Sequence, residues 1–417
     1  MAAVVRYFLP DWDDRVDPNY NFEFELSAVG RDPWRDDVYA HELFGDDQCY
    51  DGILVSRAAL EQNGAKRDEV DRLGLRKYLR LPRRFELMGD CGAFGYVDAP
   101  KPIYETPEVL EFYQRVGVDY GVSIDHIIFP AFPEQRQFRY DLTIKNAIDF
   151  LARHRAGGYA FTPVGAVQGW DVPSYAEAAR KLADAGYDML AVGGLVRSRT
   201  SDILAIAKGV TGAVGPDIRL HLLGVARNGI IPELARLGIF SFDSASPMRT
   251  SWMSATKNYL LGDAYYTAIR IPYPEPETKG VRGDNILTRS DSTITHKERQ
   301  DLEAEALKAI REYAKRKKSL GKAMKAIEAY DLHQQRRGDV VGARAGRMQD
   351  YRRTLTDRPW TKCDCQVCRD VGVEVVIFRG NNRNRRRGFH NVRDFYKNLK
   401  DRERRVRATV EQTSLGL

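Results

Sequence analysis

Residues 161–195 read FTPVGAVQGWDVPSYAEAARKLADAGYDMLAVGGL and carry the clearest structural signal in the chain. Apolar runs at 161–169 and 189–195 have the length and the glycine-rich ends of buried strands, and the segment between them has helical periodicity. Ser174 and Glu177 have the spacing of a capping box at the start of that helix. A strand, a helix and a second strand in this order indicate a βα unit of a parallel sheet.

The same alternation recurs on both sides of this stretch, over about 200–250 residues in all, which is typical of a (β/α)8 barrel. No Gly-rich dinucleotide or P-loop motif opens any of the helices, and this argues against a Rossmann-type open sheet. We therefore predict an α/β fold, a (β/α)8 TIM-type barrel. The predicted strands are 52–56, 85–90, 122–129, 161–169, 189–195, 220–225 and 240–245, and the predicted helices include 107–117, 143–155, 174–185, 201–210 and 231–237.

The barrel pattern occupies only part of the chain. Acidic and aromatic residues with three prolines precede it, so 1–45 is predicted to be an N-terminal arm or small sheet, and 46–270 the barrel. After it, the sequence IPYPEPE indicates an extended linker, and 298–330 a long charged helix or helix pair. We assign 271–355 to this linker and charged helical insertion. The last part, 356–417, contains a cysteine cluster, a basic segment and a tail.

Composition excludes several classes of protein. With 417 residues, 43% of them hydrophobic and 29% charged, the chain is neither disordered nor in need of disulfides. No run approaches 18 apolar residues, so no membrane segment is expected. Acids and Pro10 interrupt the N-terminal apolar run, which argues against a signal peptide. Five cysteines, three of them clustered, favour a metal site in a reducing compartment.

The net charge of +7, from 65 Lys+Arg and 58 Asp+Glu, is distributed unevenly. Residues 297–353 carry a net +7 and residues 379–407 a net +9, so the remainder is acidic at −9. The first stretch is explained well enough by solvated helix faces. The second begins RGNNRNRRRGFH, whose arginines, asparagines and glycines suit phosphate contact better than a helix face.

Polar residues follow most of the predicted strands, where the C-terminal strand ends of a barrel form one mouth. A single Asp there is more often a helix cap, but three at successive strand ends are harder to explain in that way. Paired carboxylates can act as nucleophile and proton-transfer group, an Asp with a Gln can read a purine edge, and a Gly-Gly turn admits a ligand to backbone amides. The candidates are Asp90, Asp125, Gln168, Gly193, Gly194, Leu195 and Asp243.

A second constellation consists of Cys363, Cys365, Cys368 and His390. Three thiolates and an imidazole at these spacings favour tetrahedral zinc in a structural site, so we predict a C-terminal zinc-binding subdomain. The alternative is three reduced cysteines that cluster without a metal. His296 and His333 lie in charged stretches and are poorer fourth ligands. His126 should face away from Asp125 and pack, since side chains alternate along a strand.

Together these motifs resemble the tRNA-guanine transglycosylases, in the same order along the chain. The opening YFLPDW, the YDGILVS segment at 50–56 and the insertion at about 270–355 are similar to the DpdA branch, the DNA 7-deazaguanine transglycosylases. The tRNA enzymes have Asp-Ser-Gly-Gly-Phe-Gln where this chain has Asp90-Cys-Gly-Ala-Phe-Gly. The thiol of Cys91 is a weaker hydrogen-bond partner than a hydroxyl, so base binding differs there.

The resemblance implies base exchange in DNA without strand cleavage, in the cytoplasm of a bacterial or phage-infected cell. Asp243 would attack C1′, and Asp90 would take a proton from an incoming 7-deazaguanine such as preQ0. The base-binding set would comprise Cys91, Asp125, Gln168, Gly193, Gly194 and Leu195. Zinc would be structural, and four arginines would grip phosphates beside the mouth: Arg383, Arg385, Arg386 and Arg387.

Three alternatives stay open from the sequence. One is a tRNA-guanine transglycosylase with the same chemistry, and another is a non-catalytic nucleic-acid-binding paralogue, against which Asp90 and Asp243 speak. The third is a metal-dependent barrel hydrolase, which would need several histidines at strand ends. An accessory DNA-modification protein and a homodimer are open as further partners.

Overall fold

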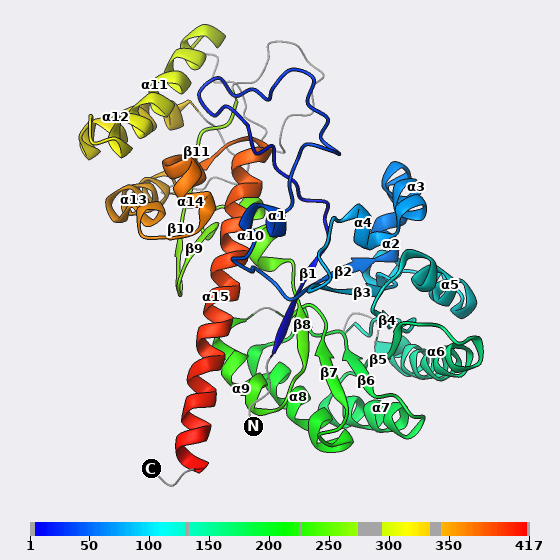
Figure 1. Ribbon diagram of the computed structural model, residues 1–417. Helices are drawn as coiled ribbons and strands as arrows, with labels where there is room; N and C mark the ends of the chain where they lie inside the picture. Colours follow the sequence, from blue (N-terminus) through cyan, green and yellow to red (C-terminus); the bar gives the residue numbers. More distant parts are fainter. Residues whose placement is uncertain (1–4, 130–132, 226, 274–293, 334–342, 415–417) are drawn as a thin grey trace. The chain divides into compact units, whose positions relative to one another are not determined.

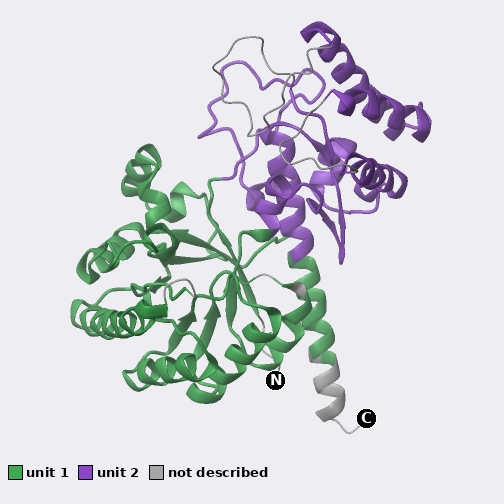
Figure 2. Cartoon of the chain, turned by 180° about the vertical axis from the view of Figure 1, so that it is seen from behind, with its two compact units in different colours: residues 1–13, 48–246, 396–417 green, residues 14–47, 247–395 purple. Residues whose placement is uncertain are grey.

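The computed structural model describes residues 5–129, 133–225, 227–273, 294–333 and 343–414 (Figure 1). The chain divides into two compact units, shown in Figure 2. The first unit comprises 1–13, 48–246 and 396–417, and the second comprises 14–47 and 247–395. Among the described residues, no helix combines the length and the apolar character that crossing a bilayer requires.

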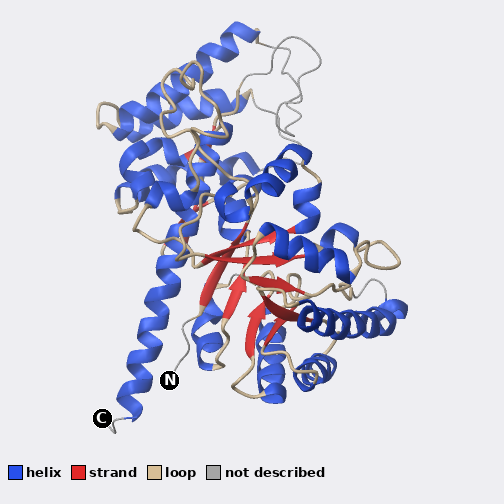
Figure 3. Ribbon diagram, turned by 45° about the vertical axis from the view of Figure 1, so that its right-hand side comes forward, coloured by secondary structure: helices blue, strands red, loops and turns tan. Residues whose placement is uncertain are grey.

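The first unit contains a closed barrel of eight parallel strands, which confirms the predicted fold class. Each strand pairs with the next along the chain, and β1 closes the barrel against β8, with Tyr7 opposite Phe242. Figure 3 shows the strands gathered in the centre with helices outside them. The strands are β1 (Arg6–Pro10), β2 (Gly52–Ser56), β3 (Glu86–Asp90), β4 (Tyr120–Val122), β5 (Thr162–Val167), β6 (Met189–Val192), β7 (Arg219–Leu222) and β8 (Ser241–Asp243).

Strand β1 lies in the segment for which the sequence predicted an N-terminal arm. Its run between Arg6 and Pro10 is short and offers little period-2 pattern, so no local signal separates it from a loop. Hydrogen bonding to both β2 and β8 makes it a strand. The rest of the predicted arm, 14–47, belongs to the second unit and contains the short helix α1 (Ala40–Phe44).

Helices surround the barrel in the order that the sequence predicted (Figure 1). Helix α7 starts two residues earlier than predicted, because Asp171 is its N-cap and Ser174 is the N3 partner in the capping box. The predicted box of Ser174 with Glu177 is therefore wrong by one helical turn. The helices are α2 (Arg57–Glu61), α3 (Gly64–Leu73), α4 (Leu75–Tyr78), α5 (Thr106–Val116), α6 (Arg136–Gly157), α7 (Val172–Asp184), α8 (Thr200–Val214) and α9 (Ile231–Arg236).

Apolar side chains fill the inside of the barrel, as expected for a packed core rather than a pore. They come from alternate positions of the strands, since side chains of a strand point to opposite faces in turn. This core closes the centre of the barrel and leaves the polar chemistry to the strand ends. Its buried members are Phe8, Leu54, Met88, Tyr120, Val122, Val164, Ala166, Met189 and Ala191.

The second unit is largely helical. The stretch predicted as a long helix or helix pair is a pair, α11 and α12, and most of the proline-rich linker lies outside the described residues. The arginine-rich stretch opens helix α15, so the expectation that it would not be helical is wrong. Its elements are α10 (Ser246–Met253), β9 (Tyr259–Leu261), β10 (Ala264–Tyr266), β11 (Ile269–Arg270), α11 (His296–Ala314), α12 (Leu320–Leu332), α13 (Ala343–Asp357), α14 (Gln366–Val371), β12 (Ile377–Phe378) and α15 (Gly380–Ser414), which is shared with the first unit from residue 396.

Candidate active site and metal cluster

Five of the eight strands deliver polar groups to the C-terminal mouth of the barrel. Asp90 is the last residue of β3, Gln168 follows β5 directly, and Asp243 ends β8. Asp125 comes three residues after β4, and a Gly-Gly pair follows β6. Asp125 and Asp243 are buried, and Asp90 is half-buried with its Oδ1 enclosed, at the place where active sites of such barrels form.

Asp90 is the carboxylate with the most perturbed surroundings. Burial, and then the charges of Asp243 and Asp125, raise its pKa to about 7, while hydrogen bonds from Ser56 and the Gly92 backbone oppose the shift. Its Oδ1 is buried and accepts no hydrogen bond from any residue that the structure describes. A carboxyl group with this pKa can both give and take a proton near neutral pH.

Asp125 and Gln168 form a hydrogen-bonded pair. The Gln168 amide nitrogen donates to Asp125 Oδ2 at 2.6 Å, and burial raises the pKa of Asp125 to about 6 against the effect of this bond. Gln168 Oε1 is buried and has no hydrogen-bond partner among the described residues. The pair therefore offers a carboxylate and an amide oxygen to a ligand that carries N–H donors.

The turn after β6 lies against this pair. A Cβ at Gly193 would come within 2.3 Å of Gln168 Nε2, and one at Gly194 within 2.9 Å of Gln168 Oε1. Gly194 also has φ of +76°, which disfavours any side chain. Tyr175 Oη donates to the Gly193 carbonyl at 3.0 Å and holds the turn in place, and the adjoining Leu195 is fully buried.

Asp243 is held by two donors that the sequence argument did not include. His221 Nε2 lies 3.1 Å from Asp243 Oδ1, and the Gly224 amide donates to the same oxygen at 2.9 Å. His221 Nδ1 lies 2.8 Å from Ser241 Oγ. The register between β7 and β8 could have identified His221 as a neighbour of Asp243. Ser241 and Asp243 share a face of β8, and His221 is opposite Ser241 on β7.

Two further sequence candidates lie among packing contacts. The Cys91 thiol is buried 3.6 Å from Tyr113 Oη on α5, and burial raises its pKa, so it is not a reactive thiolate. Its contact with a base remains a prediction. His126 is buried and its Nε2 contacts the Ala99 carbonyl at 2.9 Å, in agreement with the predicted packing role.

The second unit brings the four predicted metal ligands together. The ligand atoms of Cys363, Cys365, Cys368 and His390 lie within 4.8 Å of one another. His390 Nδ1 is 3.5, 3.4 and 3.4 Å from the three sulfurs in that order. Metal–sulfur bonds of about 2.3 Å and metal–nitrogen bonds of about 2.0 Å at tetrahedral angles give a spacing of about 3.5 Å. The cluster can therefore hold a tetrahedral metal ion.

The surroundings of His390 support this arrangement. Its other ring nitrogen, Nε2, lies 2.5 Å from the Leu260 carbonyl, and its ring stacks on Tyr259 with centroids 4.0 Å apart. A backbone acceptor on the far nitrogen of a ligating histidine fixes the tautomer that presents Nδ1 to the metal. Cys365 also caps helix α14, so the cluster organises the local backbone.

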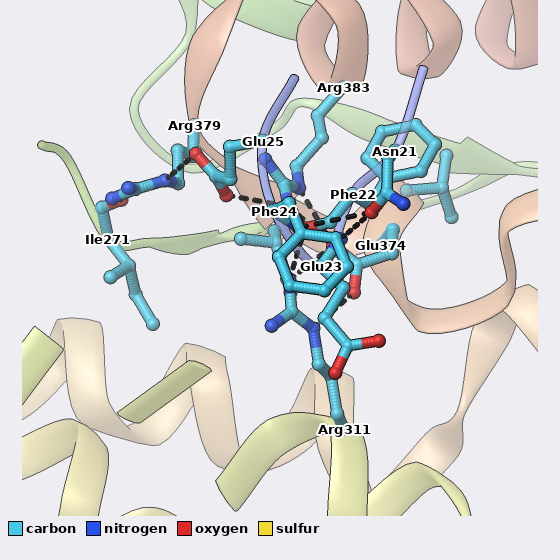
Figure 4. A network of polar contacts seen from close by, with 12 residues as sticks. Asn21, Phe22, Glu23, Phe24, Glu25, Ile271, Arg311, Glu374, Arg379 and Arg383 are labelled. Carbon is cyan, nitrogen blue, oxygen red and sulfur yellow. Dashed lines mark hydrogen bonds and ion pairs between the residues drawn. The ribbon is translucent and has the colours of Figure 1, made fainter. Parts of the chain in front are cut away.

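The arginines predicted to contact phosphates are engaged within the second unit. Arg383 is buried between Glu25 and Glu374, and Figure 4 shows Arg379 and Arg311 bonded to the same two carboxylates. Arg386 donates to the Asp17 carbonyl and Arg387 to the Ser251 carbonyl. Burial thus speaks against phosphate contact by Arg383, Arg386 and Arg387. Arg385, with its side chain 34% exposed, is the one that stays a candidate.

Comparison with known proteins relates this chain to guanine transglycosylases. The family model described as queuine tRNA-ribosyltransferase matches residues 98–266. A DNA-guanine transglycosylase of Salmonella montevideo is 36% identical over 414 residues, covering 95% of this chain and 96% of that protein. A tRNA-guanine(15) transglycosylase of Pyrococcus abyssi is 26% identical over 204 residues, 47% of this chain and 34% of that protein. A tRNA-guanine(15) transglycosylase of Haloarcula marismortui is 27% identical over 168 residues, 38% of this chain and 33% of that protein.

Proposed function

Since this chain belongs to the guanine transglycosylase family that contains the Salmonella DNA-guanine transglycosylase, we propose that it exchanges guanine in DNA for a 7-deazaguanine base. The observation that carries the proposal is that two carboxylates at one barrel mouth, those of Asp243 and Asp90, have different environments. Asp243 has one oxygen held by two donors, and Asp90 has a pKa of about 7. A nucleophile and a proton carrier are the groups that base exchange needs.

In the first half-reaction, Asp243 attacks C1′ of the target nucleotide. A bond forms between its carboxylate oxygen and C1′, the C1′–N9 bond breaks, and the electron pair leaves with guanine. Protonated Asp90 gives its proton to the departing base. The product is a covalent glycosyl ester on Asp243, as in the two-step route of retaining glycosidases.

The second half-reaction reverses these roles. Asp90, now ionised, takes the proton from N9 of the incoming base, and that nitrogen attacks C1′. The ester bond to Asp243 breaks and the carboxylate is restored. Because the proton that Asp90 takes from the incoming base replaces the one it gave to guanine, the complete cycle needs no other acid, base or cofactor.

The base is recognised by its edge. Asp125 accepts N–H groups of the guanine edge, Gln168 adds its amide, and the backbone amides of Gly194 and Leu195 meet the carbonyl oxygen. Guanine and preQ0 present the same donors and acceptor there, so one pocket serves both halves of the exchange. The target nucleotide must leave the helix stack to reach this pocket, because C1′ and the base edge are shielded in a duplex.

We propose that the metal held by the cysteine–histidine cluster is zinc, in a structural role. All four ligand positions are supplied by the protein, which leaves no open coordination site for chemistry. The metal would fold the local segment around α14 and hold the start of α15.

To decide between DNA and tRNA as the substrate, the protein is incubated with duplex DNA and preQ0 and, in parallel, with tRNA and preQ0. Nucleoside mass analysis then shows which nucleic acid is modified. We expect the modified deoxynucleoside in DNA and none in tRNA. Asp243→Asn should abolish exchange and the covalent adduct, by about 10⁴-fold or more, while metal content stays the same. Exchange into tRNA alone would assign the alternative substrate, and a fully active Asp243→Asn protein would contradict the mechanism.

A further inference from the structure

His221 is a buried histidine that neither the sequence argument nor the proposed chemistry uses. It is fully buried in β7, and its ring packs edge-on against Phe8, which belongs to the barrel interior, at a centroid distance of 5.9 Å. Its two ring nitrogens contact different residues of β8: Nε2 contacts Asp243 and Nδ1 contacts Ser241. A polar ring inside an apolar core is costly unless both nitrogens are satisfied, and here β8 satisfies both.

The direction of the two hydrogen bonds of His221 follows from which partner atoms can accept. Asp243 Oδ1 already receives the Gly224 amide, so this carboxylate is an acceptor and His221 must donate to it from Nε2. A neutral imidazole with its proton on Nε2 has an acceptor at Nδ1, and the Ser241 hydroxyl can donate to it. Ser241 is fully buried, which protects this chain of bonds from competing water.

Both donors reach the same carboxylate oxygen. The His221 Nε2–Oδ1 distance is 3.1 Å and the Gly224 N–Oδ1 distance is 2.9 Å. Two donors at fixed positions, one within β7 and one just after it, restrict how the carboxyl group can rotate. The group is then oriented with Oδ1 as the held oxygen and Oδ2 as the one available for bonding.

We propose that His221 and Ser241 are positioning residues that present Oδ2 of Asp243 to C1′. The inference rests on the proposed base exchange and names residues that act on its nucleophile. Ser241 sets the tautomer of His221, and His221 together with the Gly224 amide holds Oδ1. When Oδ2 bonds to C1′, the pair of electrons in the C1′–N9 bond leaves with the base, and Oδ1 becomes the ester carbonyl. A carbonyl oxygen still accepts both hydrogen bonds, so the same donors hold the glycosyl ester for the second half-reaction.

The test compares steady-state exchange of preQ0 into duplex DNA by Ser241→Ala, His221→Leu and His221→Gln with that of the wild-type protein. We expect Ser241→Ala and His221→Leu to lower kcat by about 10-fold to 100-fold, as loss of an orienting partner does elsewhere. KM for the base should change little, because Asp125 and Gln168 are untouched. His221→Gln should recover part of kcat, since its side-chain amide can donate toward Oδ1.

A matched control is His154→Gln, because His154 is also a buried histidine, bonded to the Phe161 carbonyl at 2.7 Å. It should keep the wild-type kcat. If His221→Leu does not fold, Ser241→Ala decides the matter. Wild-type kcat in a folded Ser241→Ala protein, or a loss that falls on KM instead, would overturn the positioning role. Wild-type protein without any exchange would overturn the proposed function itself, and this inference with it.

Discussion

At the scale of residues, the candidate site contains three chemically identical side chains in three different environments. Asp90, Asp125 and Asp243 are all aspartates at one barrel mouth, yet their neighbours differ. Asp243 has a histidine and a backbone amide on one oxygen, Asp125 has an amide side chain, and Asp90 has an orphaned oxygen beside two negative charges. Such differences would separate the proposed nucleophile, recognition group and proton carrier.

The raised pKa of Asp90 predicts a pH dependence of the first half-reaction. Departure of guanine needs protonated Asp90, so the single-turnover rate of guanine release should fall as pH rises through about 7. Rapid-quench measurements with labelled guanine in DNA would follow it. Asp90→Asn should remove both the release and its pH dependence, and a rate that rises through this range would contradict the assignment.

The same shift makes a prediction about stability. The pKa of Asp90 is about 7 in the folded protein and lies above the unfolded value of about 3.9. The stability that protonated Asp90 contributes is therefore fully present below about pH 3.9 and is lost as pH rises through about 7. Asp90→Asn lacks the ionisable group, so its Tm relative to wild type should rise as pH is raised between about 4 and about 7. Thermal unfolding scans measure this. A Tm difference that does not vary with pH would contradict a raised pKa of Asp90 in the folded protein.

At the scale of elements, the turn after β6 must stay free of side chains. Gly194→Ala would place a methyl group 2.8 Å from Tyr175 Oη and 2.9 Å from Gln168 Oε1, at φ of +76°. Because both neighbours must move, we expect kcat/KM for the incoming base to fall by about 10-fold to 100-fold. The matched control is Gly212→Ala in α8, which has nothing within 4 Å and should keep its activity while gaining about 0.5–1 kcal/mol of stability. Equal behaviour of the two variants would contradict a role of this turn in base binding.

The cysteine–histidine cluster gives a second prediction at this scale, on metal content and stability. Cys365→Ser should lose the metal and unfold more easily, because a structural metal contributes its binding energy to folding. Metal analysis of the purified protein, together with thermal unfolding with and without a chelator, measures both effects. Cys49→Ser changes a buried cysteine outside the cluster and should keep one metal per chain. Full metal content in Cys365→Ser would show that this thiol is not a ligand.

At the scale of the whole molecule, net charge is a poor guide to where nucleic acid binds. Residues 379–407 carry a net +9, yet the first arginines of this stretch neutralise buried carboxylates of the second unit. Figure 4 shows that Glu25 and Glu374 each meet two arginines. Charge used inside a protein releases no counterions from DNA and adds nothing to the salt dependence of binding.

Arg383→Met should therefore act on stability and leave DNA binding unchanged. Removing this guanidinium leaves Glu25 with Arg379 and Glu374 with Arg311 as remaining partners, so we expect a cost of about 2–3 kcal/mol from the lost charged hydrogen bonds. The slope of log K against log salt should match that of the wild-type protein. Arg404→Met, which removes a side chain that is 76% exposed, should cost less than about 1 kcal/mol. Denaturant unfolding and binding titrations at several salt concentrations measure both quantities, and a slope reduced by about 1 in Arg383→Met would restore the phosphate role.

Much of the barrel was predictable because its signals are local. Apolar runs such as 161–169 and 189–195 mark strands by their own composition, and the polar residues that follow them must meet at one mouth in a parallel barrel. The four metal ligands were predictable for a similar reason, since three of them lie within six residues of one another. The structure brings both sets together.

The remaining features depend on pairing between distant segments. Strand β1 forms only because β2 and β8 lie on either side of it, and His221 becomes part of the site only through its register with Ser241. The arginines around the start of α15 had the composition of a phosphate site, but Arg379 and Arg383 pair with Glu25, hundreds of residues away in sequence. The sequence by itself thus determined the barrel, the carboxylates at its strand ends and the cysteine–histidine cluster. Only the tertiary structure decided which charges are used inside the protein and which donors hold Asp243, because burial and long-range pairing have no local signature.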